Sequence, residues 1–197
     1  NENNINTIAK KNKFKVLLVE SVISEIPIIS NCFIPDIAIL DPNLTISLPS
    51  KITAYTSIDA FTHGIESYCS NLNNALTNSY SVAGAKLIIE NLDEVVASPD
   101  NVLAREKLLY GSMLTGLAQS MTSVGGVHAL SHTVASKIEL PHGNLNAIFL
   151  IPMIKFNMQE SPLIVEFLQQ LGFSGIEKLE EWISRIFVNT GMIDKWG

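Results

Sequence analysis

The four histidines of the chain fall in two short windows of the sequence, DAFTHGIESY at residues 59–68 and GGVHALSHTVASKIELPHG at residues 125–143. In the first window Asp59 and His63 are four residues apart, so on a helix their side chains would point from the same face, one turn apart. His128 and His132 repeat this spacing in the second window. Neutral imidazoles together with a carboxylate are suitable ligands for divalent zinc, iron, nickel or copper. Each window could therefore contribute two ligands to a metal ion.

His142 follows ten residues after His132, in a Pro-Gly turn from which the chain could fold back toward the same point. Each of these residues or residue pairs, taken alone, has an ordinary structural explanation. An Asp and a His four apart arise often by chance, a histidine in an apolar helix such as His128 is more often a satisfied core residue, and a lone His142 would be a loop residue. The combination favours a metal site, but the spacing selects no reaction.

The sequence after Pro49 predicts helices, because apolar residues recur at spacings of three and four. No α/β alternation follows. We therefore expect a mainly α fold, a bundle-like helical domain, with helices near residues 52–71, 76–97, 101–121, 126–137 and 145–157.

Two further helices are indicated near the end of the chain. Ser161 and Pro162 should open the first, and Gly172 should close it. Ser174 with Glu177 predicts a capping box for the second. That helix should end at a left-handed Gly191 and place one apolar stripe against the core, made of Ile176, Leu179, Ile183, Ile186 and Phe187.

The start of the chain differs from the remainder. Residues 14–19 (FKVLLV) and 34–40 (IPDIAIL) are short apolar runs rich in β-branched residues. Such runs predict β-strands.

The composition excludes several classes of protein. Hydrophobic residues make up 47% of the 197 residues and charged ones 16%, which is typical of a globular chain. A net charge of -6 with scattered Lys and Arg argues against a nucleic-acid partner. No apolar run approaches the roughly 20 residues of a membrane span. Cys32 and Cys69 give no disulfide framework, so we expect free thiols and a cytoplasmic location.

Two segments resemble iron-containing (group III) alcohol dehydrogenases, a family related in fold to glycerol dehydrogenases and dehydroquinate synthases. IPDIAILDPNLTISLPSKITAYTSIDAFTHGIESYCS is similar to the segment that leads from the family's cofactor domain into its helical domain. GGVHALSHTVASKIELPHGNLNAIFLIPMIKFN is similar to the family's second histidine block. The resemblance implies metal ligation by Asp59, His63, His128 and His142, with Fe²⁺ the first choice of metal and Zn²⁺ the second.

The resemblance also implies a role for His132, which falls at the family position near the substrate and the nicotinamide. It is a candidate catalytic residue that relays a proton or orients the alcohol. Thr133 and Ala135 stand where the family usually has Pro and Gly, so the helix beside His132 departs from the family pattern. Glu66, one turn beyond His63, is either a partner that orients a ligand ring or an ordinary salt-bridge residue.

Family members bind NAD or NADP through an N-terminal α/β domain with glycine-rich phosphate loops. This sequence has no G-x-G. The expected organisation is therefore residues 1–50 as the end of a mostly absent dinucleotide-binding domain and residues 51–197 as the helical metal-binding domain. NAD or NADP would act only with the missing domain supplied.

The activity that the resemblance implies is NAD(P)-linked hydride transfer between a small-molecule alcohol and its aldehyde. One alternative is a non-catalytic remnant that keeps the helical fold and binds no nucleotide. Another is a metal-dependent hydrolase, which the absence of an HExxH motif disfavours. We also hypothesise a homo-oligomer, formed through the face on which a cofactor domain would pack.

Overall fold

The structure, a computed structural model, describes residues 37–135 and 137–194. The chain divides into two compact units, residues 1–40 and residues 41–197. The strand expected at 14–19 lies outside the described residues. Residues 37–40 do not form the strand expected at 34–40, because an extended segment becomes a strand only beside a hydrogen-bonding neighbour, and no strand occurs in the part of the chain that the structure describes.

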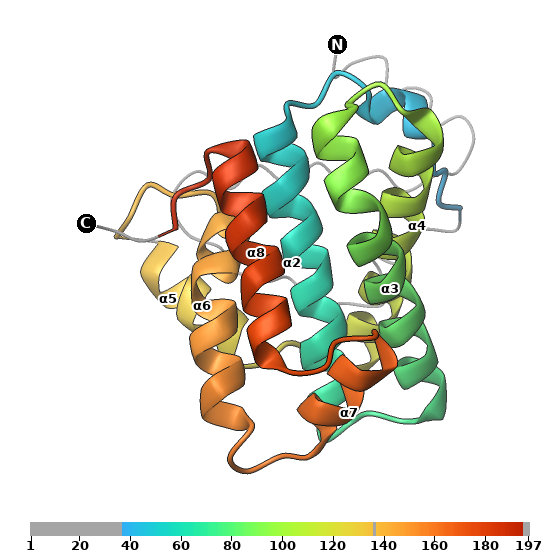
Figure 1. Cartoon of the computed structure of the whole chain (residues 1–197). Coiled ribbons are helices and arrows are strands. Elements are labelled where there is room, and N and C mark those ends of the chain that lie inside the picture. The colour runs from blue at the N-terminus through green and yellow to red at the C-terminus, as the bar shows by residue number, and fades with distance from the viewer. Residues whose placement is uncertain (1–36, 136, 195–197) are drawn as a thin grey trace. The chain divides into compact units, whose positions relative to one another are not determined.

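The second unit contains the helices labelled in Figure 1, and they confirm the mainly α fold. After the short 3-10 helix η2 (Pro42–Thr45), the described helices are α2 (Ser50–Cys69), α3 (Ala75–Ala97), α4 (Val102–Thr122), α5 (Gly126–Ala135), α6 (His142–Asn157), α7 (Leu163–Gln170) and α8 (Ile176–Thr190). Helix α6 differs from the prediction, because it begins at His142, where a turn was expected. None of the described helices has the length and apolarity that crossing a bilayer requires.

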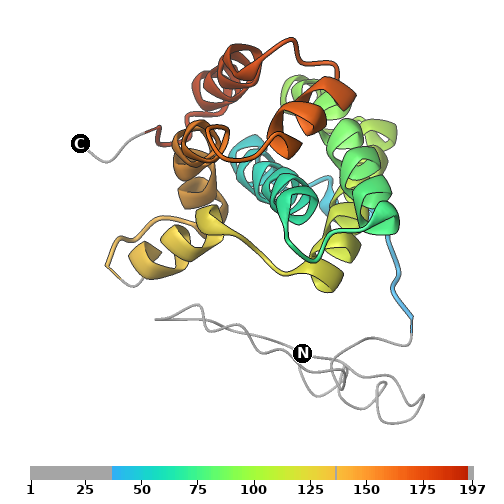
Figure 2. The ribbon, with the colours of Figure 1, turned by 90° about the horizontal axis from the view of Figure 1, so that it is seen from below.

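Helix α2 is the central element of this unit. It packs against α3, α4, α5, α6, α7 and α8, and Figure 2 shows it seen end-on with the other helices around it. Its buried residues include both apolar ones such as Phe61 and small polar ones such as Thr62. A helix surrounded on all sides has no broad solvent face, so the carboxylate and imidazole that α2 carries have to be accommodated inside the fold.

Glycines let α3 and α4 approach each other closely. A Cβ on Gly84 would lie 2.7 Å from the carbonyl oxygen of Gly111, and a Cβ on Gly111 would lie 2.8 Å from that of Gly84. Gly116, by contrast, has no such neighbour within 4 Å. Of the two glycines of α4, Gly111 is therefore the one at which the two helices pack closely.

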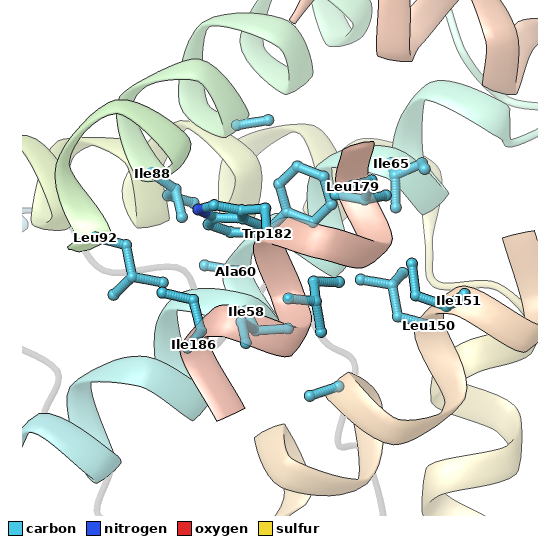
Figure 3. Packing of buried hydrophobic residues seen from close by; sticks show 14 of the residues in the cluster. Ile58, Ala60, Ile65, Ile88, Leu92, Leu150, Ile151, Leu179, Trp182 and Ile186 are labelled. Atoms are coloured by element: carbon cyan, nitrogen blue, oxygen red, sulfur yellow. The ribbon is translucent and has the colours of Figure 1, made fainter. Parts of the chain in front are cut away.

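The apolar stripe of α8 lies in the core, as the sequence predicts: all five of its residues are buried. Figure 3 shows Leu179, Trp182 and Ile186 among side chains from α2, α3 and α6. Phe61 of α2 joins the same core, with its ring centroid 5.7 Å from that of Trp182 and 6.2 Å from that of Phe167. These contacts fix α2 relative to the helices around it.

Of the two predictions for the ends of α8, the one for its C-terminal end is confirmed and the one for its N-terminal end is wrong. Gly191 is left-handed, with φ 65° and ψ 28°, as expected. The capping box of Ser174 and Glu177 is wrong, because the N-cap is Gly175 and no side chain caps the helix. The helix begins one residue later than a Ser174 cap requires, so the serine hydroxyl lies outside the first turn.

Candidate metal centre

The predicted ligands come from three helices. Asp59 and His63 lie one turn apart on α2, His128 lies on α5, and His142 is the first residue of α6. Glycine allows α6 to approach α2 here: a Cβ on Gly143 would overlap the carbonyl oxygen of Tyr55 and lie 2.8 Å from its carbonyl carbon. A close approach of two backbones at Gly143 thus brings the adjacent His142 beside α2.

Three of these side chains converge on one point. Asp59 Oδ1 lies 3.3 Å from His128 Nε2 and 3.7 Å from His142 Nε2, and one ligand atom from each of the three residues lies within 4.8 Å of the others. Two ligands of one zinc or iron ion lie roughly 3.0 to 3.4 Å apart when each bond is about 2.1 Å long. The three groups therefore need only small shifts to share an ion.

His63 lies at the side of this group. Its Nε2 atom is 3.9 Å from Asp59 Oδ1. Its ring stacks on the ring of His128, with the centroids 4.7 Å apart and the planes at 16°. The arrangement places His63 within reach of the same point, but less directly than the other three residues.

His132, the predicted catalytic residue, lies on the other side of the histidine group. Its ring centroid is 5.0 Å from that of His142 and 6.2 Å from that of His128. The side chain is half-buried. The rings of the four histidines thus form one contiguous group, although they come from windows about 60 residues apart.

Glu66 contacts the site through His128. One carboxylate oxygen lies 2.6 Å from His128 Nδ1, and the carboxylate also accepts hydrogen bonds from the backbone N–H groups of Gly125 and Val127 at the start of α5. Of the two interpretations open from the sequence, the structure therefore shows the one in which Glu66 orients a site histidine. A donor on Nδ1 leaves Nε2, which faces Asp59, as the nitrogen available to a metal.

The electrostatics of the group follow from burial and from these contacts. Burial opposes a charge on His128, but its hydrogen bonds to Asp59 and Glu66 outweigh that cost and raise its pKa to about 9. Burial also opposes the charge of Asp59, yet the hydrogen bond with His128 and the neighbouring imidazoles lower its pKa. Burial lowers the pKa of His63, against the attraction of Asp59. His63 is thereby favoured as a neutral imidazole, the form that binds metals.

Asn146 is a member of the site that the sequence analysis missed. Its side-chain Nδ2 atom lies 2.5 Å from Asp59 Oδ1, 2.9 Å from His142 Nε2 and 3.1 Å from His128 Nε2. The residue is fully buried. Its position one helical turn after His142 is the signal that could have identified it, because residues four apart share a helix face.

A cavity of about 160 Å³ elsewhere in the same unit contains none of these residues. Arg105 lines it together with Thr53 and Leu48. The Arg105 guanidinium donates to the carbonyl oxygen of Leu48 at 3.2 Å and to that of Ile46 at 3.4 Å. These bonds tie the segment before α2 to α4, which is a structural role.

The donor set fits a divalent cation. It offers one carboxylate oxygen and imidazole nitrogens, all largely shielded from water, which is a combination that iron and zinc accept. The fit is supported by the polar atom that already lies among them, since the Asn146 Nδ2 position is surrounded by one carboxylate oxygen and two imidazole nitrogens.

Comparison with known proteins agrees with this geometry. Residues 53–192 match the C-terminal domain of the Fe-containing alcohol dehydrogenase family. The chain is 38% identical over 131 residues to 1-propanol dehydrogenase PduQ of Salmonella typhimurium, a match that covers 66% of this chain and 35% of that protein. It is 36% identical over 129 residues to 1,3-propanediol dehydrogenase of Klebsiella pneumoniae, which covers 66% of this chain and 33% of that protein.

A solved structure shows the same fold. The sulfoacetaldehyde reductase of Bifidobacterium kashiwanohense, determined in complex with NAD+, superposes with a TM-score of 0.79 and 33% sequence identity over 85% of this chain and 45% of that one. The chain thus spans about a third of the length of the curated relatives that it matches. Because the matched domain, the shared helical fold and the sequence identity agree, the chain belongs to the iron-containing alcohol dehydrogenase family, with its residues 53–192 corresponding to the family's C-terminal domain.

Proposed function

We propose that this chain supplies the metal-binding half of an NAD(P)-linked alcohol dehydrogenase that interconverts a small-molecule alcohol and its aldehyde. The observation that carries the proposal is the convergence of Asp59, His128 and His142 from three separate helices. The relatives named above are dehydrogenases or a reductase of small alcohols and aldehydes, which supports the same substrate class.

In this proposal Asp59, His63, His128 and His142 hold the metal, with Fe²⁺ preferred and Zn²⁺ second. A bound divalent ion would supply Lewis-acid chemistry at the oxygen of an alcohol or aldehyde. Glu66 keeps the Nε2 atom of His128 directed toward Asp59, and the apolar core behind α2 holds the helices that carry the ligands at fixed separations.

His132 is the proposed catalytic residue. Its ring lies 5.0 Å from the ring of His142 and is half-buried, so it lies beside the proposed ion and not at its centre. An imidazole in this position can hold a proton close to a substrate hydroxyl or orient that hydroxyl by a hydrogen bond. NAD or NADP would bind through an α/β domain of the kind that the family carries before its helical domain.

Metal analysis tests the ligand assignment. The purified chain should retain about one divalent ion per molecule after dialysis, measured by elemental analysis, and should bind Co²⁺ with a visible absorption band. His63→Ala and His142→Ala should each weaken retention sharply, because a lost ligand lowers metal affinity. His132→Ala is the matched control and should retain the ion. Equal retention in all three variants would refute the ligand set.

A separate experiment tests the reaction. The helical unit can be joined to the remainder of the Bifidobacterium sulfoacetaldehyde reductase, whose structure was determined with NAD+, and assayed with NADH and short aldehydes. We expect turnover that depends on added Fe²⁺ or Zn²⁺ and is lost in His132→Ala. A metal-loaded fusion that binds NADH but transfers no hydride would favour the non-catalytic alternative.

The proposed setting is the cytosol, with small molecules as the ligands. Burial raises the pKa of the Cys69 thiol to about 12, which disfavours the reactive thiolate. Self-association of the chain remains a separate proposal, and light scattering on the purified chain would contradict it by finding a monomer.

A further inference from the structure

The carboxamide of Asn146 lies where an ion shared by the three converging ligands would have to lie. Its Nδ2 atom is between 2.5 and 3.1 Å from Asp59 Oδ1, His142 Nε2 and His128 Nε2. Metal–ligand bonds to these atom types are about 2.0 to 2.2 Å long. No point can be that close to all three atoms without coming within contact distance of Nδ2, so the amide and an ion exclude each other.

The hydrogen bonding of this carboxamide is incomplete. An amide nitrogen carries two hydrogens, and one carboxylate oxygen and two imidazole nitrogens surround it here, so at least one of these three contacts is not an N–H hydrogen bond from the amide. The other end of the group, Asn146 Oδ1, is buried and accepts no hydrogen bond within the described part of the chain. A buried carbonyl oxygen without a donor is unfavourable, which lowers the cost of moving the amide elsewhere.

From this geometry we propose that Asn146 is a displaceable placeholder: its amide nitrogen holds Asp59, His128 and His142 together, and a divalent cation takes its place and drives the side chain away. The inference rests on the metal site of the proposed function. It assigns to Asn146 the role of a positioning residue that sets metal affinity, without making it a ligand.

The Asn146 amide and a metal ion therefore compete for the same position, and a mutation can remove this competition. Asn146→Ala deletes the amide, so an incoming ion no longer has to break its contacts. Since net hydrogen-bond contributions are modest, we expect Co²⁺ or Zn²⁺ to bind Asn146→Ala roughly three- to tenfold more tightly than the wild-type chain. The thermal midpoint of the chelator-treated variant should fall, because Asp59, His128 and His142 lose the amide group that lies among them.

Asn144→Ala is the matched control. Asn144 is also fully buried and lies two residues away on the same helix, but the hydrogen bonds that the structure describes for its side chain are with the backbone of Ile193. This variant should lose stability and keep wild-type metal affinity.

A second variant preserves the shape of the side chain. Asn146→Asp places a carboxylate oxygen close to Asp59 Oδ1, so the chelator-treated protein should have a lower thermal midpoint than the wild type. The added metal should then raise the midpoint by more than it does in the wild type, since an ion relieves the repulsion between the two carboxylates.

The experiment titrates chelator-treated 197-residue chains with Co²⁺ alone, following absorbance and thermal midpoint. Tighter binding by Asn146→Ala and a larger metal-induced shift in Asn146→Asp support the inference. Unchanged or weaker Co²⁺ binding by Asn146→Ala, or a shift in Asn146→Asp no larger than in the wild type, overturns it. A wild-type chain that takes up no Co²⁺ would instead refute the metal site itself.

Discussion

The carboxylate of Glu66 lies 2.6 Å from Nδ1 of the buried His128 and at the same time accepts the backbone N–H groups of Gly125 and Val127. The Glu66 side chain of α2 therefore has two effects on α5. It satisfies backbone donors at the start of that helix, which have no partner within the helix, and it orients the imidazole that the helix carries. The position of α5 and the direction of its histidine are consequently coupled.

Glu66→Gln should reduce metal affinity. Glutamine has nearly the same shape but lacks the charge that holds the Nδ1 proton of His128, so the ring is less firmly fixed. Loss of such an outer partner typically lowers metal affinity about 10- to 100-fold. Co²⁺ titration measures the change. Glu180→Gln, which disrupts an exposed ion pair with Lys155, is the control and should leave affinity unaltered. Equal affinities in both variants would argue against an orienting role for Glu66.

The stability of the chelator-treated chain should fall between pH 6.5 and about 9. The pKa of His128 is raised to about 9 in the folded chain, against 6.5 as its ordinary value. Protonated His128 therefore stabilises the fold fully below pH 6.5, and this contribution is lost as the pH rises toward 9. The lowered pKa values of Asp59 and His63 act at lower pH and do not produce this trend.

Thermal midpoints at pH 6.5, 8 and 9.5 in the presence of a chelator measure this dependence. His128→Gln cannot titrate, so its midpoint should change less over the same range. A wild-type midpoint that rises or stays level from pH 6.5 to 9.5 would contradict the assignment of the raised pKa to His128.

Gly143→Ala should destabilise the fold and weaken metal binding together. The added methyl would overlap the backbone of Tyr55, which cannot yield as a flexible side chain could, and we expect a loss of about 1 to 3 kcal/mol. Urea denaturation measures the loss. Gly116→Ala offers a comparison within α4: apart from its chain neighbours and the adjacent backbone of its own helix, no atom lies within 4 Å of its new methyl, so a gain of roughly 0.5 to 1 kcal/mol is expected. A neutral Gly143→Ala would show that α2 and α6 are not held at this separation.

Phe61→Ala should cost about 3 to 5 kcal/mol of unfolding free energy. Phe61 is fully buried on α2 and contacts Phe167 and Trp182, so its removal leaves a cavity between α2, α7 and α8. Phe156→Ala, at a side chain that is 69% exposed, should change stability by less than about 0.5 kcal/mol. Similar losses in the two variants, measured by denaturant titration, would be inconsistent with this core.

The sequence by itself determined the helices and the residue types at the site. Apolar spacings of three and four are a local property, and they predicted the α2 to α8 segments to within a few residues at most ends. Local chemistry was less informative at helix ends, as the failed capping box at Ser174 shows. The similarity of the two histidine windows to one family can also be recognised from the sequence alone, and the matched domain confirms it.

Only the tertiary structure decided how these residues meet. The meeting of Asp59 with His128 and His142 depends on the close approach at Gly143 and on the core that surrounds α2, both of which join residues far apart in the chain. The same contacts placed Glu66 beside His128 and Asn146 among the ligands. A spacing of four puts Asn146 on the same helix face as His142, but it does not specify which side chains of other helices that face meets. Helix periodicity depends on neighbouring residues, whereas the position of an imidazole relative to a carboxylate depends on how whole helices pack.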